Sequence, residues 1–384
     1  MTLNRRHVVA ALGGAALTAC APKPSPIKYD GDADVLILGA GLAGLRAAQI
    51  LTEAGISVMV LEATDRLGGR VSTRRYEDGF IEAGSARIRQ SDKRVQDLAT
   101  KMGLLLGPVS TPQDAKTVWA QGQSLLLNAE QSASFVTPTP TPFQISAADL
   151  KIIGGMQRLP DAMANSLLSW PVLKTYIKSI SVADKEVTAT DHTGRIWRGQ
   201  QMLCALPFGA LRHLQIQSDM PEAQKLSITG TPYVQNLQIQ FRAKTPFWEI
   251  DNLPADMWMD GPLGHIIADR DAAGVPTGLF HSSLYGDQIG ALYENSAKGL
   301  QQRIRAELAR LRPSTYANIE ILHIVDWTKD NRAAGGAYVQ SSSTDIIGDP
   351  VGRLHFAGSH LSRIATGMEG ALDSAERAAA AILA

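Results

Sequence analysis

The stretch DVLILGAGLAGLRAAQILTEAGISVMVLEATDRLGGR, residues 34–70, carries the clearest structural signal in the chain. Its apolar pattern predicts a buried strand at 35–38, a glycine-rich turn, a helix to about residue 54 and a second strand at 56–61. Strand, helix and strand in this order are typical of a doubly wound α/β domain with a parallel sheet. We therefore expect this unit to form the centre of the fold.

The turn after the first strand has the residues that a dinucleotide requires. Gly39 permits the tight turn, Gly41 lets the backbone approach a pyrophosphate, and Gly44 lets the helix pack closely on the strand. Glu62 follows the second strand, where its carboxylate can accept ribose hydroxyls. On these residues alone, NAD and FAD are both open. The predicted binding turn consists of Gly39, Ala40, Gly41, Leu42, Ala43 and Gly44.

Composition excludes several classes of function. The 384 residues suffice for two packed units, and the 37 Lys and Arg residues balance the 37 Asp and Glu residues. This zero net charge leaves no electrostatic footprint for nucleic acid, so no nucleic-acid partner is predicted. The two cysteines, Cys20 and Cys204, support no disulfide framework, and Cys204 lies in an apolar run typical of a core. No metal site is predicted.

Residues 1–20, MTLNRRHVVAALGGAALTAC, are predicted to be an export signal outside the fold. Arg5 and Arg6 precede the apolar run 8–19, which is too short to span a bilayer but suits a signal peptide. The arginine pair resembles a twin-arginine export signal. We therefore expect a periplasmic or cell-envelope protein.

The end of this segment bears on membrane attachment. Residues 17–20 resemble a lipoprotein cleavage box, which would make a lipidated Cys20 the protein's contact with the membrane. Ordinary cleavage after Ala19 or Ala21 is the alternative. Residues 21–31 are rich in proline and are predicted to be an extended linker.

Four motifs, the first of which ends the opening stretch, indicate a family. EATDRLGGR at 62–70 and DGFIEAGSAR at 78–87 are followed by GGMQRLPDAMA at 154–164 and GRLHFAG at 352–358. In this order they resemble the flavin-containing amine oxidases. The resemblance implies FAD and a Rossmann-type FAD-binding domain interleaved with a smaller α+β substrate domain. The implied division gives 32–93, 151–229 and 324–384 to the FAD-binding domain, and 94–150 and 230–323 to the substrate domain.

The resemblance also implies how the cofactor is held. Some family members bind flavin covalently through a cysteine where this chain has Ala337, so non-covalent FAD is expected. The last helix, from about 367 to 383, is expected to aim its positive N-terminal end at the flavin ring. Ser359 stands where the family has a glutamate. Beyond the turn and Glu62, the implied cofactor-binding residues are Ala63, Gly69, Arg70, Gly84, Ser85, Ala86, Arg87, Ile177, Gly358, Ser359, Gly367, Met368, Glu369 and Ala371. For Glu369, a structural role is the alternative to facing the cofactor.

The substrate region departs from the family. The sequence around Arg87 resembles the L-amino-acid oxidase branch, in which an arginine pairs with the substrate carboxylate. The alternative is that Arg87 joins neighbouring basic residues on a solvated face. Gln238 replaces a lysine that positions a water, ten residues before Trp248, and can itself hydrogen-bond a water. Arg87 and Gln238 are thus the predicted catalytic residues.

The usual aromatic pair beside the reactive amine is replaced by Arg332 and Gly367, unless Tyr338 or Trp327 substitutes for it. The stretch 94–150 is shorter than the family's roofing insertion, so a more open site is expected. Two roles are possible for His360: a hydrogen bond near the cofactor, or packing in the hydrophobic core.

The predicted function is FAD-dependent oxidation of a C–N bond in an amino acid or amine, with hydride transfer to flavin N5. Oxygen, a quinone or a cytochrome would accept the electrons. One alternative is a flavin dehydrogenase or desaturase for a bulkier substrate, with a quinone or cytochrome acceptor. Another is a catalytically weak FAD-binding envelope protein.

Overall fold

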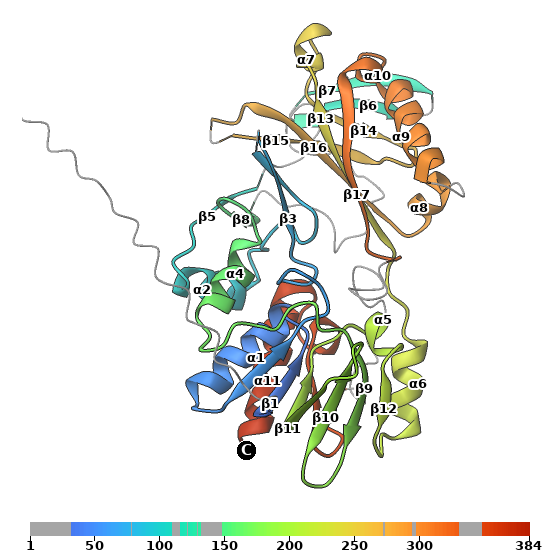
Figure 1. Cartoon of the computed structure of the whole chain (residues 1–384). Helices are drawn as coiled ribbons and strands as arrows, with labels where there is room; N and C mark the ends of the chain where they lie inside the picture. Colours follow the sequence, from blue (N-terminus) through green and yellow to red (C-terminus); the bar gives the residue numbers. More distant parts are fainter. Residues whose placement is uncertain are drawn as a thin grey trace, which may run out of the picture.

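The computed structural model contains two bodies, each built on a sheet (Figure 1). It describes residues 32–77, 79–109, 116–120, 122–128, 130–131, 148–271, 273–293, 297–329 and 348–384. Within these ranges, no helix is long and apolar enough to cross a membrane. The predicted signal and linker lie outside the described residues, as do Arg332, Ala337 and Tyr338.

The first sheet has seven strands and is organised around β1 (Asp32–Leu38). β1 lies parallel to β2 (Val58–Leu61) on one side and to β11 (Ile196–Cys204) on the other. Leu36 and Ile37 are completely buried, as expected for a parallel strand covered on both faces. The remaining strands of this sheet are β9 (Ile177–Val182), β10 (Val187–Asp191), β12 (Gln215–Gln217) and β18 (Leu354–Phe356).

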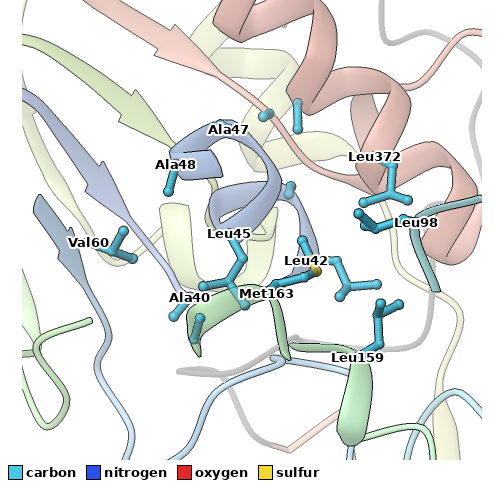
Figure 2. Close-up of a cluster of buried hydrophobic side chains, with 14 of the residues drawn as sticks. Ala40, Leu42, Leu45, Ala47, Ala48, Val60, Leu98, Leu159, Met163 and Leu372 are labelled. Carbon is cyan, nitrogen blue, oxygen red and sulfur yellow. The ribbon is translucent and has the colours of Figure 1, made fainter. Parts of the chain in front are cut away.

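Helix α1 (Leu42–Glu53) packs against this sheet and against α11 (Gly367–Leu383). Small buried side chains such as Ala47 and Ala375 let helices approach closely. Figure 2 shows the cluster around α1, in which Leu98 lies beside Leu372 of α11. The other helices of the first body are α2 (Lys93–Lys101), α4 (Arg158–Asn165), α5 (Phe208–Leu211), α6 (Glu222–Gly230) and the 3-10 helix η2 (Ser359–Leu361). The predicted strand–helix–strand unit is confirmed.

The second sheet has seven strands in the order β17-β13-β16-β15-β14-β6-β7. Along β13 (Asn236–Ala243), alternate side chains such as Leu237 and Ile239 enter a core shared with α9, while Gln238 and Gln240 face the first body. The other strands are β6 (Lys116–Ala120), β7 (Gln123–Leu127), β14 (Asp256–Met259), β15 (His265–Arg270), β16 (Pro276–Tyr285) and β17 (Ile319–Asp326). The helices of this body are α7 (Phe247–Ile250), α8 (Asp287–Leu292), α9 (Ala297–Leu311) and α10 (Thr315–Asn318).

Two short antiparallel pairs complete the fold. They are β3 (Thr73–Tyr76) with β4 (Gly79–Glu82), and β5 (Leu106–Pro108) with β8 (Leu150–Ile152). The first pair reaches the second body, where the Tyr76 hydroxyl donates to Oε1 of Gln240 over 2.7 Å. The segment after β4 is thereby held between the two bodies.

The predicted division at residues 93 and 150 differs from the structure. The amphipathic helix α2 buries Val95 and Leu98 in the first body, so this part of 94–150 does not join the second. By contrast, β6 and β7 extend the second sheet through parallel pairing of β6 with β14. The second body also runs past residue 323, because β17 ends at Asp326.

Candidate active site

The glycine turn has the geometry that a pyrophosphate requires. Gly39 has a φ of +101°, and a Cβ on Gly44 would lie 1.9 Å from the carbonyl oxygen of Gly39. A Cβ on Gly41, by contrast, would meet no atom of the described residues within 4 Å. Helix α1, which starts at Leu42, has no side-chain cap, so its N–H groups and positive end suit an anion. The space beside Gly41 is therefore a phosphate cradle that a side chain would fill.

Glu62 braces this turn from the end of β2. Its Oε2 accepts from the backbone N–H of Ala40 at 2.8 Å, and its Oε1 accepts from the N–H and the hydroxyl of Thr64 at 2.9 and 2.8 Å. A carboxylate offers about four acceptor positions, so one remains for a ribose hydroxyl. Ala63, which follows directly, is half-buried.

The loop around Gly69 and Arg70 lies against the turn. The N–H of Gly68 donates to the carbonyl oxygen of Ala40 at 2.8 Å, and a Cβ on Gly69 would lie 3.4 Å from the Cα of Gly41. Arg70 donates to the hydroxyl of Ser359 at 3.0 Å. Ser359, at the family's glutamate position, thus ties the segment after β18 to this loop.

Gly84 and Ser85 run alongside the same loop. A Cβ on Gly84 would lie 2.0 Å from the carbonyl oxygen of Arg70, and Ser85 donates its N–H to that oxygen at 3.0 Å. Ser85 and Ala86 are half-buried. Glycine is therefore required at 84 for this close approach.

Arg87 forms a close ion pair with a protein carboxylate. Its Nη1 lies 2.8 Å from Oδ2 of Asp149, and the two side chains are 14% and 6% exposed. Burial lowers the pKa of Arg87, while the Asp149 carboxylate and the nearby Tyr285 hydroxyl oppose that shift. Arg87 is thus absent from the solvated face and is already paired with a protein carboxylate. Asp149 was missed because its stretch of sequence carries no motif.

Gln238, on the second sheet, contacts the segment around Gly84, which lies along the Arg70 loop. Its Nε2 donates to the carbonyl oxygen of Gly84 at 3.1 Å, while its buried Oε1 has no hydrogen-bond partner among the described residues. Such an unsatisfied acceptor costs about 1–3 kcal/mol, so a water or ligand donor there would stabilise the site. Trp327 makes a parallel contact, donating to the carbonyl oxygen of Ala83 at 3.0 Å. This bond fixes the indole beside the Gly84 segment.

Helix α11 starts where the resemblance predicts, with Thr366 before it and no side-chain cap. Gly367 is exposed with a φ of +69°, Met368 is buried and Ala371 is half-buried. The uncapped start of this helix can stabilise negative charge on a nearby group.

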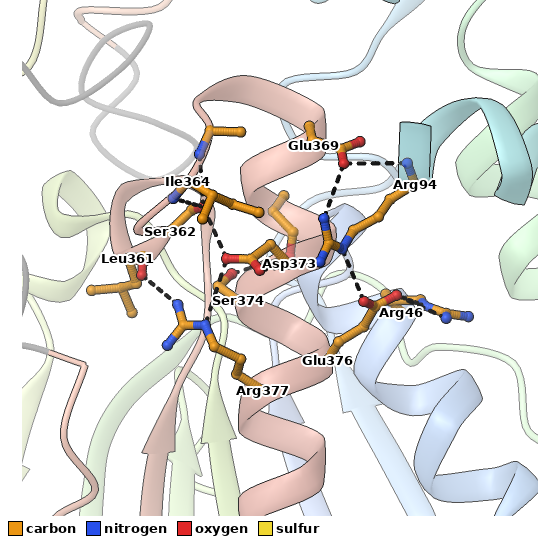
Figure 3. Close-up of polar contacts among 12 residues, drawn as sticks. Arg46, Arg94, Leu361, Ser362, Ile364, Glu369, Asp373, Ser374, Glu376 and Arg377 are labelled. Carbon is orange, nitrogen blue, oxygen red and sulfur yellow. Dashed lines mark hydrogen bonds and ion pairs between the residues drawn. The ribbon is translucent and has the colours of Figure 1, made fainter. Parts of the chain in front are cut away.

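Glu369 was predicted among the cofactor-binding residues, but its carboxylate faces α2 (Figure 3). Its oxygens accept from the backbone N–H groups of Arg94 and Val95, each at 3.2 Å, and from the Arg94 guanidinium at 3.2 Å. These bonds satisfy orphan donors at the start of α2. These contacts fit the structural alternative for Glu369, which caps the start of α2.

Ile177 and the segment after β18 are largely structural. The Ile177 side chain belongs to a core cluster on the first sheet, and Gly358 donates its N–H to the hydroxyl of Ser374 at 2.9 Å. His360 packs edge-on against Phe208, with ring centroids 4.2 Å apart. Burial, together with the charge of Arg70, lowers the pKa of His360 to about 3, so the ring is neutral. The core alternative for His360 fits this environment.

These features define a class. A phosphate cradle, a ribose-facing carboxylate and a second sheet whose polar side chains reach the cofactor motif describe a two-domain, dinucleotide-dependent oxidoreductase. The sequence profile of the family "Flavin containing amine oxidoreductase" matches residues 42–139 and 123–383, and the chain belongs to this family. It is an FAD-dependent oxidoreductase of amines or amino acids.

Individual proteins agree with this assignment. The chain is 25% identical to the flavin-dependent L-tryptophan oxidase RebO of Lentzea aerocolonigenes, over 92% of this chain and 98% of that protein. It is 20% identical to flavin-containing amine oxidase A of Sus scrofa, over 91% and 85%. Among solved structures, cyclohexylamine oxidase from Brevibacterium oxydans has a TM-score of 0.73 at 19% identity, covering 91% of this chain and 98% of that one. Putrescine oxidase bound to putrescine has a TM-score of 0.73 at 18% identity, covering 92% and 99%.

The described residues fit FAD. The cradle beside Gly41 suits the pyrophosphate, Glu62 keeps an acceptor for the ribose, and the start of α11 suits the electron-rich end of the flavin ring. The orphaned Oε1 of Gln238 offers an acceptor on the side of the second sheet. Of the residues on which the aromatic pair and covalent attachment depend, Arg332, Ala337 and Tyr338 lie outside the described residues, whereas Trp327 and Gly367 lie within them.

Proposed function

We propose that this chain is an oxidase that removes hydride from the carbon bearing an amino group and passes the electrons on to oxygen. The observation that carries the proposal is the buried Oε1 of Gln238, which has no hydrogen-bond partner among the described residues. The Nε2 of the same side chain donates to the carbonyl oxygen of Gly84 at 3.1 Å. Bound FAD supplies the two-electron acceptor chemistry. The relatives, named as oxidases of L-tryptophan, putrescine and cyclohexylamine, support an amine or amino-acid substrate.

The role proposed for Gln238 is to orient a hydrogen-bond donor, a water or the substrate amine, beside the carbon that loses hydride. Because its amide N–H is committed to Gly84, the carboxamide cannot rotate freely and Oε1 keeps a fixed direction. A water or the N–H of a neutral amine can donate to that oxygen. The reaction needs a fixed geometry more than an added acid or base, because the cofactor carries the electronic demand.

Product analysis tests the proposal. The purified holoenzyme is incubated in air with benzylamine, cyclohexylamine, putrescine and a set of L-amino acids, and ammonia and hydrogen peroxide are quantified. We expect equal amounts of both products from at least one substrate. Ammonia released only when a quinone analogue is added would overturn oxygen as the acceptor. Absence of ammonia in every reaction would overturn the amine substrate.

We also propose that the chain acts in the cell envelope, anchored through Cys20. Residues 1–20 support this, because a twin-arginine-like pair precedes an apolar run and a lipoprotein-like box. The full chain and a Cys20→Ser variant are compared by cell fractionation. We expect the full chain with membranes and the variant in the periplasmic fraction. Cytoplasmic recovery of both would contradict export.

A further inference from the structure

Arg87 and Asp149 are held together by the backbone on either side of them. Ile88 and Leu150, the residues that follow them, exchange backbone hydrogen bonds of 2.6 and 2.8 Å. This bridge fixes the two segments independently of the side chains. The ion pair therefore belongs to a preformed arrangement, which a ligand cannot easily pull apart.

The pair lies close to the residues that define the site. Arg87 is three residues beyond Gly84, whose carbonyl oxygen binds Gln238. On the second sheet, Gln238 is paired with Ser283 of β16. Tyr285 lies two residues beyond Ser283, on the same face of the strand, and interacts electrostatically with Arg87. On the other side, Arg89 reaches the hydroxyl of Thr366, just before α11, at 3.4 Å. Arg87 and Asp149 thus lie between the Gln238 face and the start of α11.

Asp149 changes what Arg87 can bind. A buried guanidinium attracts a substrate carboxylate through charge-assisted hydrogen bonds. Here the Asp149 carboxylate, 2.8 Å from Nη1, already neutralises that charge, and a second carboxylate at the same guanidinium would face like-charge repulsion. An amine without a carboxylate meets a neutral pair and no such repulsion.

We infer that Asp149 determines specificity by masking Arg87, so that the site prefers amines lacking a carboxylate to the corresponding amino acids. This inference rests on the proposed oxidation of amines and narrows its substrate class. It assigns Arg87 a carboxylate-binding capacity that Asp149 suppresses. Neutralising Asp149 releases that capacity.

Benzoate, a carboxylate that needs no turnover, is the binding probe. Its dissociation constant is measured from the change in flavin absorbance of the holoenzyme. In Asp149→Asn, benzoate binding tightens about tenfold, because the charge of the guanidinium is no longer compensated by a protein carboxylate and can attract an external anion. The matched control is Asp269→Asn, a partly buried carboxylate 3.9 Å from Lys151, for which we expect a change of less than about twofold.

A double variant provides a second test beside the single variant Asp149→Asn. Arg87→Met/Asp149→Asn removes both charges together, which avoids an unpaired buried ion. Because Arg87 is masked in the wild type, this variant binds benzoate within about threefold of the wild type. If Asp149→Asn fails to retain FAD, Asp149→Ser is measured in its place, because the double variant can overturn the inference but cannot support it alone.

The same variants are compared for turnover of L-phenylalanine and 2-phenylethylamine. We expect the amino-acid-to-amine ratio of kcat/KM to rise about tenfold in Asp149→Asn. Unchanged benzoate binding in Asp149→Asn, or lost binding in the double variant, would overturn the inference. If neither substrate is oxidised, the proposed function is at fault, whereas the benzoate result still decides the masking of Arg87.

Discussion

The side-chain amide of Gln238 donates a 3.1 Å hydrogen bond to the carbonyl oxygen of Gly84. The bond joins the second sheet to the segment that packs along the cofactor loop, and Trp327 makes a parallel bond to Ala83. Two residues of the second sheet region thus hold consecutive carbonyl groups. The bond from Gln238 also places its side-chain acceptor, Oε1, where the two bodies meet.

Replacing Gln238 by Met tests its role in orientation. We expect kcat to fall about tenfold with FAD retained, because the directed acceptor is lost while the side-chain volume is kept. The control is Gln240→Met on the same strand and face, whose amide groups bond Tyr76 and Glu82. This control should lose stability but keep kcat within about twofold. Stopped-flow measurement of flavin reduction gives the rate for each variant. Equal decreases in rate for Gln238→Met and Gln240→Met would contradict an orienting role for Gln238.

Gly41 and Gly44 should respond differently to alanine. Gly41→Ala leaves the apoprotein's thermal unfolding unchanged, because the Cβ meets no atom within 4 Å in the part of the chain that the structure describes, yet it fills the phosphate cradle. We expect FAD binding to weaken about tenfold or more. Gly44→Ala, with its Cβ 1.9 Å from the Gly39 oxygen, should lower both stability and FAD binding. Normal FAD affinity in Gly41→Ala would contradict the cradle.

Glu369 caps a helix, so its loss should affect stability rather than the flavin. Glu369→Gln weakens the bonds to Arg94 and Val95 and should cost about 1–2 kcal/mol of unfolding free energy. The visible spectrum and reduction potential of bound FAD should stay the same. A large shift in potential would instead show that the carboxylate acts on the cofactor.

Glu82 should make stability depend on pH. Burial raises the pKa of its carboxyl from 4.5 to about 7 in the folded protein. Since the folded pKa lies above the unfolded one, folding is penalised once the carboxyl must ionise, and stability falls as pH rises from about 4.5 through about 7. The full penalty is about 3 kcal/mol.

Glu82→Gln removes this ionisation. Denaturant unfolding of the wild type and of Glu82→Gln at about pH 5 and about pH 8 measures the effect. The variant should gain stability relative to the wild type at the higher pH. A difference between the two proteins that is the same at both pH values would contradict the raised pKa.

Ala337 replaces the cysteine that some relatives use for covalent attachment, and this predicts release of the cofactor on denaturation. Acid precipitation of the holoenzyme should leave all flavin in the supernatant. Ala337→Cys provides the comparison. Flavin that remains with the wild-type pellet would show a covalent bond at another residue.

Local features of the fold were predictable from sequence, whereas side-chain pairings across the chain were not. The turn at Gly39–Gly44 follows from short-range geometry, because a Cβ on Gly44 would meet the carbonyl oxygen of Gly39. Glu62 acts on Ala40, 22 residues away, and was predictable because it ends the second strand of a strand–helix–strand unit. The family resemblance placed Glu369, in the first turn of the last helix, among the cofactor residues, with a structural role as the alternative. Its partners at Arg94 and Val95 come from a helix far away in sequence, and no periodicity connects them.

Arg87 illustrates the same limit within the site. Its side-chain type and motif indicated carboxylate binding, but its partner Asp149 precedes a short strand in an uninformative stretch. Only the backbone bridge between Ile88 and Leu150 brings the two together. Gln238 was found by its spacing from Trp248, although its bond to Gly84 required the structure.

Anaerobic reduction of the bound flavin tests the central claim most directly. The purified holoenzyme is mixed without oxygen with benzylamine, 2-phenylethylamine, cyclohexylamine, putrescine and L-amino acids, and the visible absorbance of oxidised flavin is followed. We predict complete bleaching by at least one amine, with 2-phenylethylamine reducing the flavin faster than L-phenylalanine. Flavin that dithionite reduces but that every amine and amino acid leaves oxidised would contradict it.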